Sequence, residues 1–102
     1  MKDNIKKHNK TVCITGAGGG IGRAIAIEMN KEGYNVACAD INLEGLNQTI
    51  QLLSNEKSQA IALKTDVTNV IDIKKMVNEV VKTFKSLDVM VNNAGVTRAL
   101  KI

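Results

Sequence analysis

Residues 11–22 read TVCITGAGGGIG, and this stretch decides the fold. Thr11–Thr15 has the composition of a buried strand and leads directly into a glycine cluster. An apolar pattern with helical spacing follows at Ile21, Ile25 and Met29. Glycines let the backbone turn sharply and let a phosphate approach without meeting a Cβ. A helix that begins at such a turn offers unpaired N–H groups and a positive dipole end to an anion. The stretch therefore predicts a phosphate-binding turn between a strand and a helix.

The glycine spacing separates this turn from two common phosphate-binding motifs. Gly16, Gly20 and Gly22 form the pattern G-x-x-x-G-x-G. The G-x-G-x-x-G pattern is absent, because neither Gly16 nor Gly18 has a glycine five positions later. A P-loop is excluded, because no Gly-Lys-Ser/Thr follows. A merely flexible turn is the alternative, which the position between strand and helix disfavours.

Outward from this turn, short apolar runs alternate with helical periodicity. The pattern predicts further strands at Asn35–Asp40, Ala60–Lys64 and Leu87–Val91. It also predicts three helices, of which the first ends at Gly33. The second is capped by Asn42, and its apolar face consists of Leu43, Leu46, Ile50 and Leu53. The third covers residues 69–85, and its apolar face consists of Val70, Ile73, Val77, Val80 or Val81, and Phe84. The order βαβαβαβ indicates an α/β fold, a doubly wound, Rossmann-like parallel sheet with strand order 3-2-1-4.

This sheet is expected to be incomplete. Two helices would cover one face and a single helix the other, and the fourth strand would be an open apolar edge. We therefore expect residues 11–102 to be the N-terminal part of a dinucleotide-binding domain, truncated after the fourth strand. Residues 1–10 are expected to be a basic tail. The open fourth strand is expected to be able to pair with another chain.

Composition excludes several other classes of protein. Residues 1–10 carry most of the net charge of +4, and Tyr34 and Phe84 are the only aromatic residues, so a nucleic-acid partner is not expected. No apolar run is long enough to cross a membrane. Cys13 and Cys38 lack metal-site spacing, and no metal site is predicted. A cytoplasmic location is expected.

Asp40 at the end of the second predicted strand indicates which dinucleotide binds. A carboxylate there can accept hydrogen bonds from the adenosine ribose hydroxyls, and it would repel a 2′-phosphate. Neither Gly19 nor Ile41 supplies a positive charge for such a phosphate. The prediction is NAD, with NADP less favoured. The alternative is that Asp40 only caps the turn into Asn42. Arg23 is the nearest cation and is expected to be a surface residue.

Together these motifs resemble the short-chain dehydrogenase/reductase family along essentially the whole chain. The resemblance rests on the Thr15–Gly22 turn, Asp40, Asp66-Val67 after the third strand, and Asn92–Gly95 after the fourth. It implies that Asp66 and Val67 meet the adenine. It also implies a cofactor-binding set made of Gly16, Gly18, Gly19, Gly20, Ile21 and Gly22 along the pyrophosphate and nicotinamide ribose, with Asn93, Ala94 and Gly95 as the floor beneath the cofactor.

The resemblance implies an NAD-dependent oxidoreductase that moves hydride between nicotinamide and an alcohol or carbonyl. Asn92–Arg98 is similar to reductases and dehydrogenases of 3-oxoacyl and small alcohol or polyol substrates, and a homo-oligomer is implied for a full-length enzyme. The family's catalytic serine and Tyr-x-x-x-Lys have no match, because the sole tyrosine, Tyr34, is followed four residues later by Cys38. No catalytic residue is assigned, and this chain alone is expected to be inactive. A non-catalytic dinucleotide- or protein-binding module and the cofactor half of a split enzyme remain as alternatives.

Overall fold

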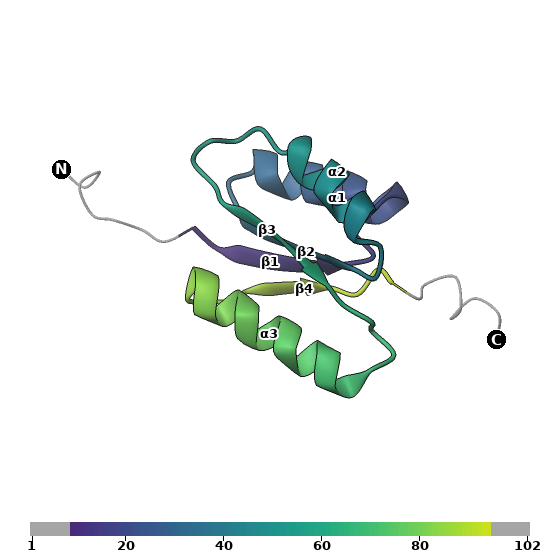
Figure 1. Cartoon of the computed structure of the whole chain (residues 1–102). Coiled ribbons are helices and arrows are strands. Elements are labelled where there is room, and N and C mark those ends of the chain that lie inside the picture. The colour runs from purple at the N-terminus through teal and green to yellow at the C-terminus, as the bar shows by residue number, and fades with distance from the viewer. Residues whose placement is uncertain (1–8, 95–102) are drawn as a thin grey trace.

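The computed structural model describes residues 9–94, which form one parallel sheet with helices on both sides (Figure 1). The strand order is β3-β2-β1-β4, and each neighbouring pair is parallel. This confirms the predicted α/β class and strand order. In chain order the elements are β1 (Thr11–Thr15), α1 (Gly20–Lys31), β2 (Asn35–Asp40), α2 (Leu43–Gln51), β3 (Ala60–Lys64), α3 (Val70–Phe84) and β4 (Val89–Val91).

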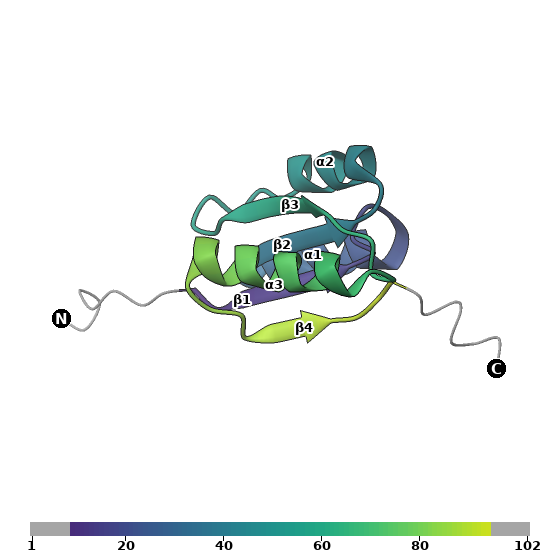
Figure 2. The ribbon, with the colours of Figure 1, turned by 60° about the horizontal axis from the view of Figure 1, so that its bottom comes forward.

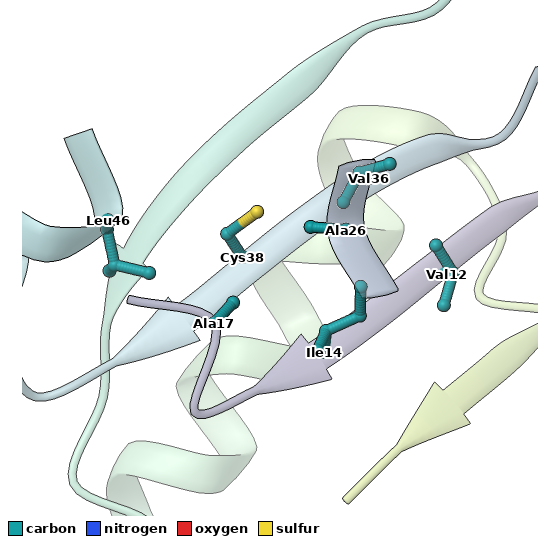
Figure 3. Close-up of a cluster of buried hydrophobic side chains, with 7 residues drawn as sticks. All are labelled: Val12, Ile14, Ala17, Ala26, Val36, Cys38 and Leu46. Atoms are coloured by element: carbon teal, nitrogen blue, oxygen red, sulfur yellow. The ribbon is translucent and has the colours of Figure 1, made fainter. Parts of the chain in front are cut away.

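Helices α1 and α2 cover one face of the sheet and α3 covers the other (Figures 1 and 2). Successive strand residues point to opposite faces, so the central strands supply two separate cores. Figure 3 shows the core beneath α1 and α2, which contains Val12, Ile14, Ala17, Ala26, Val36, Cys38 and Leu46. The core beneath α3 contains Cys13, Ala37, Ala39, Met76, Val80 and Phe84. The predicted distribution of helices, two against one, is confirmed.

Of the residues predicted to face the sheet from helix α1, Ile25 and Met29 are partly buried and pack against the core, whereas Ile21 does not. The buried row of this helix is Gly22, Ala26 and Asn30, whereas the side chain of Ile21 is 71% exposed. Met29 flanks this row and is partly buried. At Gly22 the helix lies too close to the strand-to-helix turn for a side chain to fit, because a Cβ there would overlap the Gly16 carbonyl.

Two similar corrections apply to the other helices. Helix α2 buries Gly45, Leu46 and Thr49, while the predicted core residue Leu43 is 46% exposed. Helix α3 buries Met76, Val80 and Phe84, while Val70 and Val81 are largely exposed. Val80 rather than Val81 therefore belongs to the core, and Met76 was not among the predicted core residues.

Strand β4 begins two residues later than the sequence predicts. Leu87 and Asp88 precede it and approach the start of β1, where the Asp88 N–H donates to the Thr11 carbonyl.

No helix within residues 9–94 has the length and apolar character needed to cross a membrane.

The two cysteines are buried on opposite faces of the sheet. Cys13 lies in the core under α3 and Cys38 in the core under α1 and α2. Burial raises the pKa of the Cys13 thiol to about 11 and that of Cys38 to about 12. Both remain protonated thiols at neutral pH and act as small core residues.

Candidate functional site

The carboxyl ends of the four parallel strands meet around one hollow of about 120 Å³. Ligands of open α/β sheets bind at this end, where the connections diverge to opposite faces of the sheet. The lining residues follow β1, β2, β3 and β4, and five of them belong to the site predicted from sequence. The full lining is Gly16, Asp40, Ile41, Thr65, Asp66, Val67 and Ala94.

The glycine turn, residues 16–20, brings the amino end of α1 to this hollow. Gly16 and Gly20 have φ angles of +68° and +56°, a region that favours glycine. A Cβ on Gly22 would overlap the Gly16 carbonyl, so only glycine lets the helix approach this closely. The backbone geometry therefore favours glycine at each of the three glycine positions of the G-x-x-x-G-x-G pattern.

The amino end of α1 differs from those of the other two helices. Its N-cap, Gly19, has no side chain to offer, and its first turn holds no acidic residue. In α2 the Asn42 side chain accepts from the Gly45 N–H, and in α3 Asn69 accepts from the N–H groups of two residues. Among the residues that the structure describes, the first N–H groups of α1 therefore meet no side-chain acceptor, and they can bind an anion.

Asp40 joins the end of β2 to the glycine turn. Its Oδ2 accepts from the Gly18 N–H at 2.8 Å, and its Oδ1 accepts from the Asn42 N–H at 3.0 Å. The carboxylate thus caps the turn into α2, as the alternative interpretation expected. Each oxygen can accept a second hydrogen bond, so the cap leaves room for a ligand hydroxyl as well.

Asp66 and Val67 follow β3 on the other side of the hollow. Two hydrogen bonds from Thr68, from its hydroxyl at 2.6 Å and its N–H at 2.9 Å, reach Asp66 Oδ1. These bonds lower the pKa of the Asp66 carboxyl, which is therefore an anion at neutral pH. Within residues 9–94, Oδ2 accepts no hydrogen bond and remains available to a ligand donor.

The segment after β4 is held against the glycine turn by two hydrogen bonds. The Ala94 N–H donates to the buried Thr15 hydroxyl at 3.0 Å, and Asn93 Nδ2 donates to the Gly16 carbonyl at 3.3 Å. Asn93 and Ala94 are therefore brought to the site that the sequence predicted for them. Gly95, the remaining predicted member, lies outside the described residues.

Sequence reasoning missed one polar cluster beside the turn. Arg23, expected on the surface, is half-buried, and it donates to Thr49 Oγ1 at 2.9 Å and to the Gly18 carbonyl at 2.8 Å. Gly45 packs against the same turn, because a Cβ there would overlap the Gly18 carbonyl. Gly45 and Thr49 are four residues apart on one face of α2, which is the only sequence signal for the cluster. Two of the four acceptors of the Arg23 side chain are backbone carbonyls, which leave no mark in a sequence.

Comparison with known proteins agrees with this geometry. The family model for short chain dehydrogenases matches residues 10–102. A 3-oxoacyl-acyl-carrier-protein reductase of Staphylococcus aureus is 42% identical over an alignment of 96 residues that covers 90% of this chain and 38% of that protein. A hydroxysteroid dehydrogenase from Escherichia coli superposes with a TM-score of 0.80 at 33% identity, covering 93% of this chain and 40% of that one.

A short chain dehydrogenase from Mycobacterium paratuberculosis, solved bound to NAD, has a TM-score of 0.78 at 30% identity. That match covers 89% of this chain and 39% of the other. The chain thus spans about two fifths of the length of these relatives. The family model matches nearly the whole chain, and the relatives match most of it. The chain therefore belongs to the short-chain dehydrogenase/reductase family.

Proposed function

We propose that the hollow and the amino end of α1 bind NAD, and that this chain is the cofactor-binding portion of an oxidoreductase. The observation that carries the proposal is the position of the Asp40 carboxylate beside an uncapped helix N-terminus. Uncapped N–H groups suit a pyrophosphate, and a carboxylate one residue away suits the ribose hydroxyls. A dinucleotide carries both a pyrophosphate and ribose hydroxyls, so a single molecule can bind the helix N–H groups and the Asp40 carboxylate together.

In the proposed complex, each part of the cofactor meets residues already described. The glycine turn, with Gly16, Gly18, Gly19 and Gly20, and the first helical residues Ile21 and Gly22 face the pyrophosphate and nicotinamide ribose. Asp40 accepts from the adenosine ribose, Asp66 accepts from the adenine amino group through its free oxygen, and Val67 lies against the ring. Asn93, Ala94 and Gly95 form the floor beneath the cofactor.

Two features favour NAD over NADP. The Asp40 carboxylate would repel a 2′-phosphate, because both groups are anionic. Arg23, the cation beside the glycine turn, directs its Nε and one of its terminal nitrogens at acceptors of the protein itself. The relative from Mycobacterium paratuberculosis, bound to NAD, supports the same choice.

We propose an alcohol or carbonyl compound as the substrate of the whole enzyme, of the 3-oxoacyl or small alcohol or polyol class. The similarity to the Staphylococcus aureus reductase supports this class. NAD supplies the hydride chemistry, and this chain binds and orients the cofactor. Its 102 residues contain no Tyr-x-x-x-Lys, so we expect no turnover from this chain alone. A cytoplasmic location and a homo-oligomeric whole enzyme are part of the same proposal.

Titration of the 102-residue chain with NADH and with NADPH tests the proposal. We expect saturable NADH binding, competition by ADP-ribose, and NADPH binding at least about tenfold weaker, the effect of roughly one unfavourable charge contact. A tighter complex with NADPH would contradict the role of Asp40. No binding of either dinucleotide by the folded chain would contradict the whole proposal.

A further inference from the structure

Four consecutive carbonyl groups of the glycine turn, those of residues 16–19, accept hydrogen bonds from donors of the protein. The Gly16 carbonyl accepts from Asn93 and the Gly19 carbonyl from the Arg23 backbone N–H at 3.2 Å. The Ala17 carbonyl accepts from the Thr49 hydroxyl at 2.7 Å, and the Gly18 carbonyl accepts from Arg23 Nη2. Four consecutive carbonyl oxygens are thereby occupied. A carbonyl dipole that faced an anionic pyrophosphate would repel it, so these contacts favour binding.

The Arg23 side chain organises this arrangement from between α1 and α2. The Arg23 Nε donates to Thr49 Oγ1, and the Thr49 hydroxyl donates to the Ala17 carbonyl. Its Nη2 lies 2.8 Å from the Gly18 carbonyl, 3.1 Å from the Gly45 carbonyl and 3.2 Å from Gln48 Oε1. One guanidinium therefore links the turn directly to α2. Within residues 9–94, no carboxylate lies at ion-pair distance from it.

Gly18 connects Arg23 to Asp40. The Gly18 carbonyl accepts from Arg23, while the Gly18 N–H donates to Asp40 Oδ2 at 2.8 Å. A Cβ on Gly18 would come within 2.8 Å of the same carboxylate oxygen, so the residue has little freedom to shift. The orientation of the Gly18 backbone thus sets both contacts at once.

We propose that Arg23 is a positioning residue for the adenosine half of the cofactor site. By holding the Gly18 carbonyl toward α2, Arg23 presents the Gly18 N–H to Asp40 and orients the carboxylate that distinguishes NAD from NADP. It acts through Gly18 and does not contact the 2′ position of the ribose itself. This inference rests on the proposed function, since it assigns Arg23 a part in the same site.

Arg23→Met in the full chain tests the role, with Lys31→Met as the matched control. Lys31 lies in the last turn of the same helix, and its side chain is 61% exposed. For Arg23→Met we expect NADH binding to weaken about tenfold, the effect of losing a hydrogen bond to a charged group. NADPH binding should weaken less, because a loosened Asp40 repels the phosphate less. The Gly18 amide signal in a ¹H–¹⁵N spectrum should move in Arg23→Met and stay in place in Lys31→Met.

Other outcomes would overturn the role. Equal weakening of NADH and NADPH with an unmoved Gly18 amide would mean that Arg23 only stabilises the fold. A larger loss of NADPH binding would mean that Arg23 reaches the phosphate itself. If Arg23→Met does not fold, Arg23→Lys replaces it, since a lysine keeps the charge and cannot bridge Thr49 and Gly18 together. Failure of the unmutated chain to bind either dinucleotide would refute the proposed function, and with it a role in cofactor binding. The Gly18 amide in Arg23→Met would then report separately whether Arg23 orients the turn.

Discussion

Asp40 Oδ2 accepts a hydrogen bond from the Gly18 N–H at 2.8 Å, so the end of β2 is bonded directly to the glycine turn after β1. This bond joins two motifs that are 22 residues apart in sequence. It makes Asp40 part of the backbone framework as well as part of the proposed ribose site. Substitution of Asp40 should therefore have two distinct effects, one on the choice between NAD and NADP and one on the stability of the fold.

Asp40→Asn should change cofactor preference more than folding. The asparagine oxygen can still accept from one backbone N–H, while the negative charge is lost. We expect NADH binding to weaken about tenfold and NADPH binding to tighten, because hydrogen bonds to charged groups are the stronger ones and the repulsion is removed. Isothermal titration with both dinucleotides measures this. Glu44→Gln, an exposed acid in the first turn of α2, is the control and should leave both affinities unchanged. Unaltered preference in Asp40→Asn would contradict the assignment.

Gly22→Ala should destabilise the fold, whereas Gly19→Ala should not. The added methyl on Gly22 would overlap the Gly16 carbonyl and lie 2.9 Å from Asn93 Nδ2. We expect a loss of about 1–3 kcal/mol in the free energy of unfolding, as for other overpacked sites. Gly19 has extended backbone angles and open space around a Cβ, so its substitution should cost less than about 0.5 kcal/mol. Urea denaturation compares the two variants, and equal losses would contradict the close helix approach.

The central strands β1 and β2 were predictable from sequence because they are short apolar runs buried on both faces. Thr11–Thr15 and Asn35–Asp40 have the predicted bounds, and their order follows from the handedness of the connections. The buried faces of the helices were less predictable. Periodicity selects large apolar residues such as Ile21, whereas the closest approaches in this fold belong to Gly22 and Gly45. Small and polar residues carry no hydrophobic signal even where they are most buried.

The candidate site was also predictable only in part: the residues at the strand ends could be placed from sequence, and the polar cluster around Arg23 could not. Residues at or just after the carboxyl ends of strands, such as Asp40, Asp66 and Asn93, could be placed because parallel strands bring these ends to one edge of the sheet. Arg23 could not be placed, since two of its four side-chain acceptors are backbone carbonyls. Thr49 could not either, because a single hydroxyl on a helix face is usually exposed. Contacts that depend on backbone atoms require the three-dimensional arrangement.

Acid should weaken the junction between the starts of β1 and β4. Asp88 Oδ2 accepts from the Thr11 N–H at 2.8 Å and from the Ser86 hydroxyl at 3.0 Å, and these bonds lower the pKa of the Asp88 carboxyl. A carboxyl whose pKa is lower in the folded state than in the unfolded state stabilises the fold at pH values above its ordinary, unfolded pKa. That stabilisation is lost as the pH falls through the pKa of the folded state.

Asp88→Asn isolates this charge, because the amide oxygen can still accept from Thr11. We expect the variant to be less stable than the unmutated chain at pH 7. The difference should shrink as the pH drops below about 3.9, the ordinary aspartate value. Urea denaturation at a series of pH values measures the difference. A difference that stays constant down to low pH would show that the charge of Asp88 is not involved.

Strand β4 should mediate association between copies of this chain. Within residues 9–94 it pairs only with β1, and its Met90 side chain is 39% exposed. An edge strand with apolar residues is a template for pairing with another strand, and a lysine on such an edge opposes it. We expect concentration-dependent association in sedimentation velocity, which Met90→Lys should shift toward monomer. Val70→Lys, at a residue 65% exposed at the start of α3, makes the same change away from the edge and should leave association intact. A chain that sediments as a monomer at every concentration, or equal effects of the two lysines, would rule out β4 as the contact.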